Sequence, residues 1–536
     1  MGLQARPALR YIWTMRAPVT LLLLAALPLG AAITKPVKVE GGLVAGVPGR
    51  DATVTVFKGV PFAAPPVGDL RWRAPKPVVA WQGVRQAGEF GASCIQNIVE
   101  EHKPWTHEFM THTPVSEDCL FLNVWTAAKS PSEKRPVYMY IYGGANTEGS
   151  GAVDVYDGEG LAKKGIVVIT VNYRLGILGF FTHPELTKES DVHASGNYAL
   201  LDLIAALHWI HANIAAFGGD PNRVTIGGQS AGASNTHSLV ASPLAKGLFH
   251  RAIAESGSSV SGLGLMNSRK LADQEAQGTR FAEAKGAHSL ADLRAMPWKE
   301  LTAPVQGGFR FGVVVDGYVQ PAPAGQMFAE GKQNDVPTLT GCNMHEGGAV
   351  PHPETTAEAF QRQVRQRYGA MADAFLARYP AATDEQARAS LNESSWDAER
   401  ASMYFWAVNR GKTAKTKAYT YFWDHTLPGP DADKYGAFHT SEVPYVMNSL
   451  AMSPRPFTDA DRKIADMMSS YWANFITTGD PNGKGLPHWP AVADGQTMEL
   501  GDKCAVIPVT GDKDKLALFE KFFAASASRT TPSAPR

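Results

Sequence analysis

The sequence contains little cysteine and has no excess of charge of either sign. Lys and Arg together number 51, as do Asp and Glu, so the formal net charge is zero. This balance argues against a basic surface for nucleic acid and against an acidic, solvated chain. Only four cysteines occur in 536 residues, and none lies in a CxxC pair or in a Cys/His cluster with zinc spacing. We therefore expect no nucleic-acid partner and no metal site.

Long apolar runs and internal repeats are also lacking. After the N-terminus we find no apolar stretch that reaches the about 20 residues needed to cross a membrane. Hydrophobic residues make up 44% of the chain and charged residues 19%, which is typical of a globular protein with a large core. We expect one folded domain over residues 33–524. The Ser/Thr/Pro/Ala-rich segment 525–536 predicts a disordered tail.

The N-terminal segment carries a targeting pattern. Residues 1–16 contain arginines and no acid, residues 17–29 are almost wholly apolar, and small residues follow up to Ala32. A basic stretch, a short apolar stretch and small residues predict a signal peptide over 1–32, with an uncleaved anchor as the alternative. Translation could start at Met1 or at Met15. The pattern predicts export to the periplasm or the medium, without distinguishing them, and no stable membrane insertion after cleavage.

The rest of the chain alternates short β-branched or aromatic runs with longer helical patterns. Apolar residues recur at helical spacing over 197–217. Such alternation predicts an α/β fold with a mainly parallel central sheet flanked by helices. The segment from about 260 to 410 is rich in helix formers and predicts helical excursions around the sheet. The expected strands are 54–57, 137–142, 166–172, 224–227, 251–255, 338–342 and 418–423.

A G-x-S-x-G motif, Gly228-Gln229-Ser230-Ala231-Gly232, lies between an expected strand and an expected helix. This is the context in which the motif presents a nucleophilic serine on a tight turn. The flanking glycines remove the steric clash, and the following helix N-terminus favours developing negative charge. An incidental serine in a Gly-rich turn is the alternative. Ser230 is therefore the candidate nucleophile, and it needs a base.

Hydrolases with this motif place an acid and then a histidine later in the chain. Glu346 follows the expected strand 338–342, and His439 follows the expected strand 418–423. Other residues compete for both roles. They are Asp316 for the acid, and His425 and His488 for the base.

The motifs closely resemble those of the type-B carboxylesterase/cholinesterase family, which has the α/β-hydrolase fold. The similarity runs from about Gly41 to His488. Beside the serine motif it rests on two segments, F-K-G-V-P-F-A at 57–63 with P-P-V-G at 65–68, and E-D-C-L-F-L-N at 117–123. The resemblance implies a secreted serine carboxylesterase without a cofactor, with helical excursions over the active site. It also implies a small-molecule ester substrate and leaves the oligomeric state unknown.

The resemblance further implies roles for single residues. Ser230 would be the nucleophile, His439 the base that takes its proton, and Glu346 the acid that orients the imidazole. The oxyanion hole would consist of backbone N–H groups of Gly144, Ala145 and Ala231.

Several residues depart from the family pattern. Ala145 replaces the third glycine of the glycine loop, Gln229 replaces a common Glu before the nucleophile, and Asn146 replaces a common aromatic residue. We interpret Asn146 and Gln229 as candidate substrate-binding residues of a pocket with a polar rim. A polar ester substrate is our hypothesis, and neutral drift is the alternative.

The resemblance also implies scaffold pairs. The sequence leaves open whether Cys342 and Cys504 pair with each other. The implied pairs are the disulfide Cys94–Cys119 and the ion pairs Arg71–Glu117 and Arg174–Asp202.

Two other functions are consistent with parts of this pattern. A serine hydrolase of the same fold could act on an amide, carbamate or lactone, because a triad and an oxyanion hole serve every acyl transfer. A non-catalytic binding protein could also share the fold, since fold alone does not fix function. Proteins of that class lack the serine, which argues against this alternative here.

Overall fold

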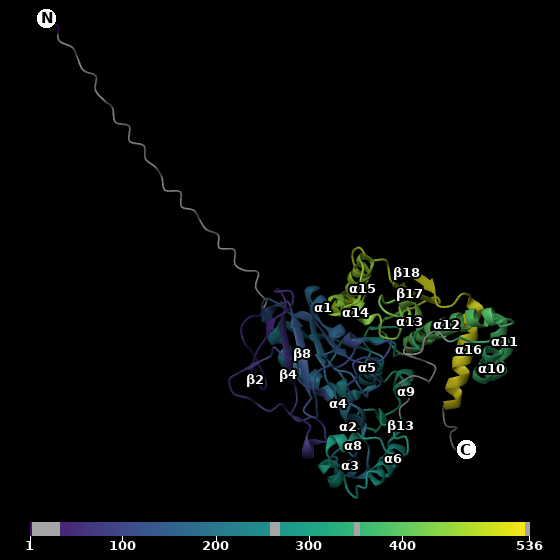
Figure 1. Ribbon diagram of the computed structural model, residues 1–536, viewed down its shortest axis with the longest axis horizontal. Helices are drawn as coiled ribbons and strands as arrows, with labels where there is room; N and C mark the ends of the chain where they lie inside the picture. The colour runs from purple at the N-terminus through teal and green to yellow at the C-terminus, as the bar shows by residue number, and fades with distance from the viewer. Residues whose placement is uncertain (3–32, 258–268, 348–353, 531–536) are drawn as a thin grey trace.

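The computed structural model describes residues 1–2, 33–257, 269–347 and 354–530, and its main feature is an 11-stranded sheet (Figure 1). The expected signal peptide lies outside the described residues except for its first two. In spatial order the strands are β18 (Ala505–Pro508), β17 (Gln496–Leu500), β16 (Ala418–Trp423), β15 (Thr338–Asn343), β12 (Arg251–Glu255), β11 (Gly219–Gln229), β9 (Arg135–Ile141), β10 (Val167–Val171), β8 (Phe121–Thr126), β4 (Thr55–Pro61) and β3 (Val47–Pro48).

The centre of this sheet is parallel and its edges are antiparallel. Every neighbouring pair from β17 to β10 is parallel. The outer pairs, β17 with β18 at one edge and β10 with β8 and then β4 at the other, are antiparallel. The expected mainly parallel sheet is therefore confirmed. Strands β12 and β16 begin and end where the sequence predicted them, because their apolar residues are buried on both faces.

Smaller sheets lie beside the large one. They consist of β1 (Val37–Val39), β2 (Gly42–Ala45) and β5 (Val84–Gln86), of β6 (Ser93–Cys94) and β7 (Val115–Ser116), and of β13 (Arg269–Lys270) and β14 (Val314–Val315).

Helices cover the faces of the large sheet. Helices α4 and α5 contact each other and pack on β11, whereas α1 and α15 contact each other and pack on β9, β10 and β8. Figure 1 shows these pairs on opposite sides of the strands. Helix α15 begins with a capping box formed by Thr458 and Asp461, which satisfies backbone N–H groups at its N-terminus. The pairs are α4 (Tyr198–Asn213) with α5 (Ala231–Ala241), and α1 (Glu159–Lys163) with α15 (Asp459–Thr478).

One helical segment is more apolar than the sequence analysis recognised. The segment Tyr198–Phe217, formed by α4 and the 3-10 turn Ile214–Phe217, is long and apolar enough to cross a membrane by length and composition alone. The expectation that no such stretch follows the N-terminus is therefore wrong. The apolar window is 61% buried inside the fold, which is typical of a core helix packed against a sheet.

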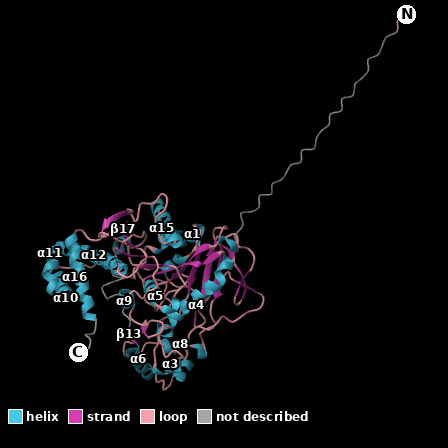
Figure 2. Cartoon of the chain, turned by 180° about the vertical axis from the view of Figure 1, so that it is seen from behind, coloured by secondary structure: helices cyan, strands magenta, loops and turns pink. Residues whose placement is uncertain are grey.

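The segment that predicted helical excursions is largely helical where it is described. Residues 258–268 and 348–353 lie outside the described residues. Figures 1 and 2 show α10, α11, α12 and α16 gathered at one end of the molecule and α3, α6 and α8 gathered at another. Each group surrounds an apolar core of its own.

The remaining helices are α2 (Gly176–Phe180), α3 (Pro184–Glu189), α6 (Leu271–Ala284), α7 (Leu290–Ala295), α8 (Trp298–Thr302), α9 (Ala324–Ala329), α10 (Ala357–Tyr368), α11 (Ala372–Arg378), α12 (Asp384–Gly411), α13 (Ala432–Tyr435), α14 (Val443–Val446) and α16 (Lys513–Thr530).

The C-terminal tail differs from the prediction. Helix α16 continues through Thr530, so residues 525–530 are helical where the sequence predicted disorder. Alanine has the highest helix propensity, and the Ala-rich start of the tail extends a helix that is already formed upstream. Residues 531–536 lie outside the described residues.

Candidate active site

Ser230 lies on the turn between β11 and α5, at the carboxyl end of the central strands. Its backbone has φ 59° and ψ −121°, a region that side chains other than glycine rarely adopt. A Cβ added at Gly228 or Gly232 would lie 2.2 or 2.0 Å from the backbone oxygen of Ile141. Only glycine therefore fits at either position, and the close packing of the turn against β9 holds the serine in its strained conformation.

The glycine loop after β9 approaches this serine closely. A Cβ added at Gly143 would lie 3.0 Å from the Cβ of Ser230. Gly144 and Ala145 have φ of 96° and 53°, and within the described chain their N–H groups donate to no protein acceptor. The N–H of Ala231 opens α5, so it has no intrahelical acceptor. Free backbone donors of this kind can stabilise a developing oxyanion.

Glu346 and His439 lie together on loops that follow β15 and β16. The Nδ1 atom of His439 forms a hydrogen bond with Oε2 of Glu346. The other carboxylate oxygen accepts the backbone N–H of Asn343 at 2.7 Å, and the backbone N–H of His439 donates to the carbonyl of His345 at 3.2 Å. A carboxylate at Nδ1 requires a hydrogen there, so Nε2 is the basic nitrogen of the neutral ring.

The pair shifts the pKa of both partners. Burial disfavours the imidazolium, but the charge of Glu346 and its hydrogen bond outweigh it and raise the pKa of His439 above its ordinary value. Burial likewise opposes the charge of Glu346, but the facing imidazolium and its hydrogen bonds lower the pKa of that carboxyl. Burial raises the pKa of Glu399 to about 7 and that of Glu442 to about 8. Where these two carboxyls are ionised, their charges also favour a positive charge on the ring.

The Nε2 atom of His439 bonds to a side-chain amide. The Nε2 atom of Gln229 lies 3.1 Å from it. The amide oxygen of Gln229 accepts the Thr440 hydroxyl at 3.3 Å, and the Trp105 indole donates to that hydroxyl at 3.2 Å. Gln229, which the sequence indicated as a candidate substrate-binding residue, is only 2% exposed. Hydrogen bonds hold both the nitrogen and the oxygen of its amide.

A cavity of about 200 Å³ opens over these groups. None of its lining residues in the described chain comes from α6–α12, so the expected helical excursions do not contribute to its wall there. Glu399 of α12 still acts on the pair electrostatically. The lining residues come from the loops 96–111, 143–156, 229–230 and 439–440, among them Gln96, Asn97, His102, Trp105, Thr111, Gly143, Gly144, Ala145, Glu148, Ser230 and His439.

Other sequence candidates lie elsewhere. Asn146 does not line this cavity, and its side-chain oxygen accepts the amide of Asn235 at 2.8 Å. The carboxylate of Asp316 accepts backbone N–H groups of its own turn, and His425 bonds to two aspartates beside α15. His488 is exposed on the surface. The structure thus brings together Ser230, Glu346 and His439 and leaves their competitors apart. In the described chain, no group of three or more His, Cys, Asp or Glu side chains could hold a metal ion.

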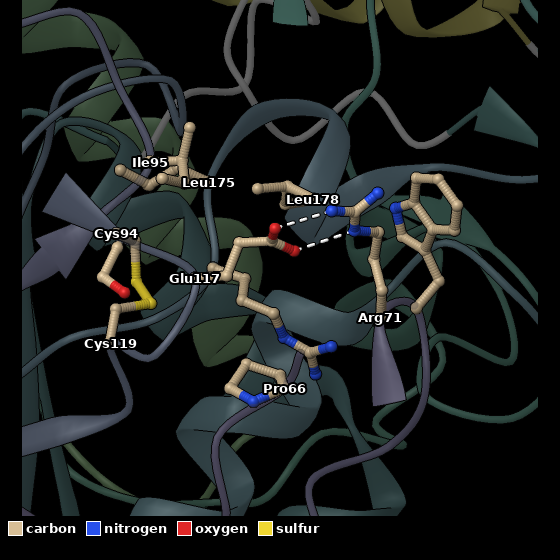
Figure 3. Close-up of a pocket in the computed structure, with 11 residues that line it drawn as sticks. Pro66, Arg71, Cys94, Ile95, Glu117, Cys119, Leu175 and Leu178 are labelled. Atoms are coloured by element: carbon tan, nitrogen blue, oxygen red, sulfur yellow. Dashed lines mark hydrogen bonds and ion pairs between the residues drawn. A yellow bond between two sulfur atoms is a disulfide. The ribbon is translucent and has the colours of Figure 1, made fainter. Parts of the chain in front are cut away.

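The scaffold pairs frame a second, much smaller cavity of about 10 Å³, which has no room for a substrate (Figure 3). The guanidinium of Arg71 binds Glu117 through bonds of 2.8 and 2.6 Å beside the disulfide Cys94–Cys119. Arg174 and Asp202 form a second bidentate pair, with bonds of 2.8 and 2.7 Å. The remaining thiols, Cys342 and Cys504, are free.

Several residues around the site were not predicted from the sequence to belong to it. Trp105 contacts the loop of His439 across 334 positions of sequence, and no local pattern indicates such a contact. Glu442 comes three residues after His439, but the segment between them is a turn and not a helix, so no helical spacing places it beside the histidine. Glu399 could not be inferred from the sequence either, because it reaches the site from α12.

Comparisons with known proteins show which family the chain is similar to. A model of the carboxylesterase family matches residues 34–514. The chain is 36% identical to a fumonisin B1 esterase from Sphingopyxis macrogoltabida, over 93% of this chain and 92% of the relative. It is 34% identical to a cocaine esterase from Oryctolagus cuniculus, over 84% and 88%. It is also 34% identical to a carboxylesterase 5A from Canis lupus familiaris, over 85% and 83%.

Proposed function

The chain belongs to the carboxylesterase family and is a carboxylic ester hydrolase, and from this premise we propose that Ser230, His439 and Glu346 form its catalytic triad. The observation that carries the proposal is the bonded Glu346–His439 pair on the same cavity as the strained Ser230. An alcohol at its ordinary pKa is a weak nucleophile, and a neighbouring imidazole makes it an effective one.

In the first half of the reaction the ester carbonyl lies over Ser230. His439 accepts the serine proton at Nε2 as Oγ attacks the carbonyl carbon, and Glu346 stabilises the imidazolium that forms. The raised pKa of His439 supports this step, because it reflects a site built to hold that positive charge. The imidazolium then protonates the leaving alcohol, and an acyl group remains on Ser230.

Backbone donors stabilise the charge on the carbonyl oxygen in both halves of the reaction. The N–H groups of Gly144, Ala145 and Ala231 are the donors in this proposal, and losing one such donor typically costs about 3–4 kcal/mol of transition-state stabilisation. In the second half a water molecule gives its proton to His439 and attacks the acyl carbon. Collapse of that intermediate returns the proton to Ser230 and releases the carboxylic acid.

The test of the triad is covalent labelling. Wild type and Ser230→Ala are treated with a fluorophosphonate, and intact mass and p-nitrophenyl acetate turnover are measured in parallel. We expect one adduct and turnover in wild type and neither in the variant. Turnover in Ser230→Ala at the wild-type rate would overturn the assignment of the nucleophile.

We further propose a polar ester as the preferred substrate. Polar side chains of Gln96, Asn97, His102, Thr111 and Glu148 on the cavity wall support this choice. The test compares p-nitrophenyl esters of increasing acyl length with esters of hydroxylated acids. Fumonisin B1 joins the panel because a relative is named for its hydrolysis. A marked preference for long acyl chains would overturn the polar-substrate proposal and leave the esterase activity untouched.

Export through a signal peptide over residues 1–32 is also proposed. The disulfide Cys94–Cys119 supports it, because disulfides persist in oxidising compartments. N-terminal sequencing of the protein recovered outside the cytoplasm is expected to begin after Ala32. Recovery of an intact N-terminus in the cytoplasm alone would overturn it.

A further inference from the structure

In the described structure, Gln229 is the only side chain that forms a hydrogen bond with Nε2 of His439, and both ends of its amide are hydrogen-bonded. Its amide nitrogen lies 3.1 Å from that imidazole nitrogen, and its amide oxygen lies 3.3 Å from the hydroxyl of Thr440. The side chain is 2% exposed, so water does not compete freely for either end. A buried amide with both ends bonded has one preferred orientation.

The polarity of the chain of bonds fixes that orientation. The indole of Trp105 can only donate, and it donates to Thr440 Oγ1 at 3.2 Å and to the backbone oxygen of His439 at 3.0 Å. The hydroxyl hydrogen of Thr440 is then available for the oxygen of Gln229. At the other end, the bond from Nδ1 to Glu346 leaves Nε2 of the neutral ring as an acceptor. The end of the Gln229 amide that faces Nε2 must therefore be its N–H, because the amide oxygen cannot donate.

The backbone at Thr440 is a second, independent observation. Its φ is 88°, in the region that favours glycine, and a β-branched residue there is a genuine outlier. Its side chain is also 7% exposed, so solvent contact does not explain its presence. A strained residue persists where its side chain is needed. The only side-chain hydrogen bonds that Thr440 makes in the described chain are those to Trp105 and Gln229.

We propose that Trp105, Thr440 and Gln229 form a hydrogen-bond relay, which holds the Gln229 N–H against Nε2 of His439 and keeps this ring neutral between turnovers, until the Ser230 hydroxyl replaces that N–H at Nε2. The inference rests on the proposed role of His439 as general base. Gln229 is then a positioning residue that acts through His439, and not a substrate contact.

The physical effect of the relay opposes that of the surrounding acids. An N–H donor stabilises the bare nitrogen and faces the N–H of an imidazolium, so it favours the neutral ring. Glu346, Glu442 and Glu399 act in the opposite direction and raise the pKa of His439. Glu148 and His102 also face the cavity. Without the relay, only burial would oppose the carboxyls, and the base would be protonated at higher pH.

The experiment is the pH profile of kcat/KM, whose acid limb reports the base of the free enzyme. Gln229→Met removes the donor at similar length, and we expect the acid limb to move up by about 0.5–1 pH unit. Gln229→Glu replaces the donor with a carboxylate, and we expect a larger upward shift of about 1–3 units. A lost plateau rate alone would not count, because any structural disturbance could lower it.

The Thr440 pair is the matched control. Thr440→Val keeps the β-branched shape but loses the hydroxyl, so we expect an upward shift smaller than that of Gln229→Met. Thr440→Ser restores the hydroxyl, so we expect it to rescue the wild-type acid limb. This pair also decides the question if Gln229→Met does not fold, which thermal unfolding would reveal.

Failure of the relay and failure of the triad give different results. All variants are labelled with a fluorophosphonate at pH 9. If every variant is labelled at Ser230 while the acid limbs of Gln229→Met and Thr440→Val coincide with wild type, the relay is wrong and the triad stands. If wild type itself takes no label, the triad fails.

Discussion

The nucleophile turn and the acid–base pair face the same cavity, but the protein holds them by different means. Ser230 is held by backbone contacts, because glycines on both sides pack directly against the oxygen of Ile141. Glu346 and His439 are held by the hydrogen bond between their side chains and by the attraction between their charges. Steric contact has no pH dependence, whereas electrostatic support does.

Because of this difference, we expect mutations in the two regions to have different effects on stability and rate. Changes at the turn are expected to alter stability at every pH. Changes around the pair are expected to alter rate, or to alter stability only within the pH range in which a carboxyl titrates. The following predictions test that separation, beginning with the largest effect.

After the loss of Ser230 itself, removing the charge of Glu346 is expected to have the largest effect on rate. Glu346→Gln keeps the shape but no longer stabilises the imidazolium, and a neutral partner permits the wrong tautomer of His439. We expect kcat to fall about 10³–10⁴-fold, by analogy with loss of the acid in other triads. Steady-state kinetics with p-nitrophenyl acetate measures it, and circular dichroism checks the fold.

Asp316 is the matched control for this prediction, because it competed with Glu346 in the sequence. Asp316 accepts backbone bonds in its own turn, away from the cavity. Asp316→Asn should lower thermal stability and leave kcat of the folded protein near wild type. The reverse pattern, with a large loss of kcat only in Asp316→Asn, would contradict the assignment of the acid.

Adding one methyl at the turn is expected to act on stability. The Cβ of Gly232→Ala would lie 2.0 Å from a backbone oxygen, which cannot move away without displacing β9. We expect a loss of about 3 kcal/mol in the free energy of unfolding, the upper end for overpacking. Urea unfolding measures it. Gly325→Ala on α9 is the control, because its Cβ would meet nothing within 4 Å. A loss at Gly325→Ala equal to that at Gly232→Ala would mean that the contact with Ile141 is not the cause.

The parts of the fold that the sequence predicted are those with local signals. Buried strands such as β12 and β16 were recognised from their apolar runs, and the Ser230 turn was recognised from its glycines. The composition of the Ala-rich tail predicts disorder, whereas the structure continues the preceding helix through Thr530. The apolar length of Tyr198–Phe217 was missed, because scattered polar residues interrupt it without lowering its mean hydropathy below that of a spanning segment.

The residues of the candidate site also differ in whether local sequence patterns could predict them. Ser230, Glu346 and His439 could be proposed from motifs and strand order, and they lie together. The contacts of Gln229 could not be predicted, because Trp105 and Thr440 come from loops that are far apart in sequence. Long-range side-chain contacts of this type depend on how the loops pack, and no periodicity in the chain encodes them.

A substitution in the glycine loop is expected to have a smaller effect, on substrate preference. Ala145 has φ 53° and lines the cavity, and we expect its methyl to limit the space for the acyl group of a substrate. Ala145→Gly keeps the N–H and removes that methyl. We expect the ratio of kcat/KM for butanoate over acetate esters to rise by up to about ten-fold, the effect of one methylene. An unchanged ratio would mean that the acyl group does not contact Ala145.

The smallest expected effect is a change in the pH dependence of thermal stability caused by Glu255. This residue supports the nucleophile turn, because its backbone oxygen accepts the N–H of Ser230 at 2.8 Å. Burial raises the pKa of its carboxyl from 4.5 to about 8, so the folded state binds a proton between those values that the unfolded state has released. Stability from this group is therefore present below about pH 4.5 and is lost as the pH rises toward 8. Glu255→Gln removes the titration, and we expect its Tm to exceed that of wild type by an amount that grows to roughly 1–2 °C at pH 8. Thermal unfolding from pH 5 to pH 9 measures it, with Glu520→Gln on the exposed face of α16 as the control. Parallel Tm curves for Glu255→Gln and wild type would show that the buried carboxyl does not couple the nucleophile turn to pH.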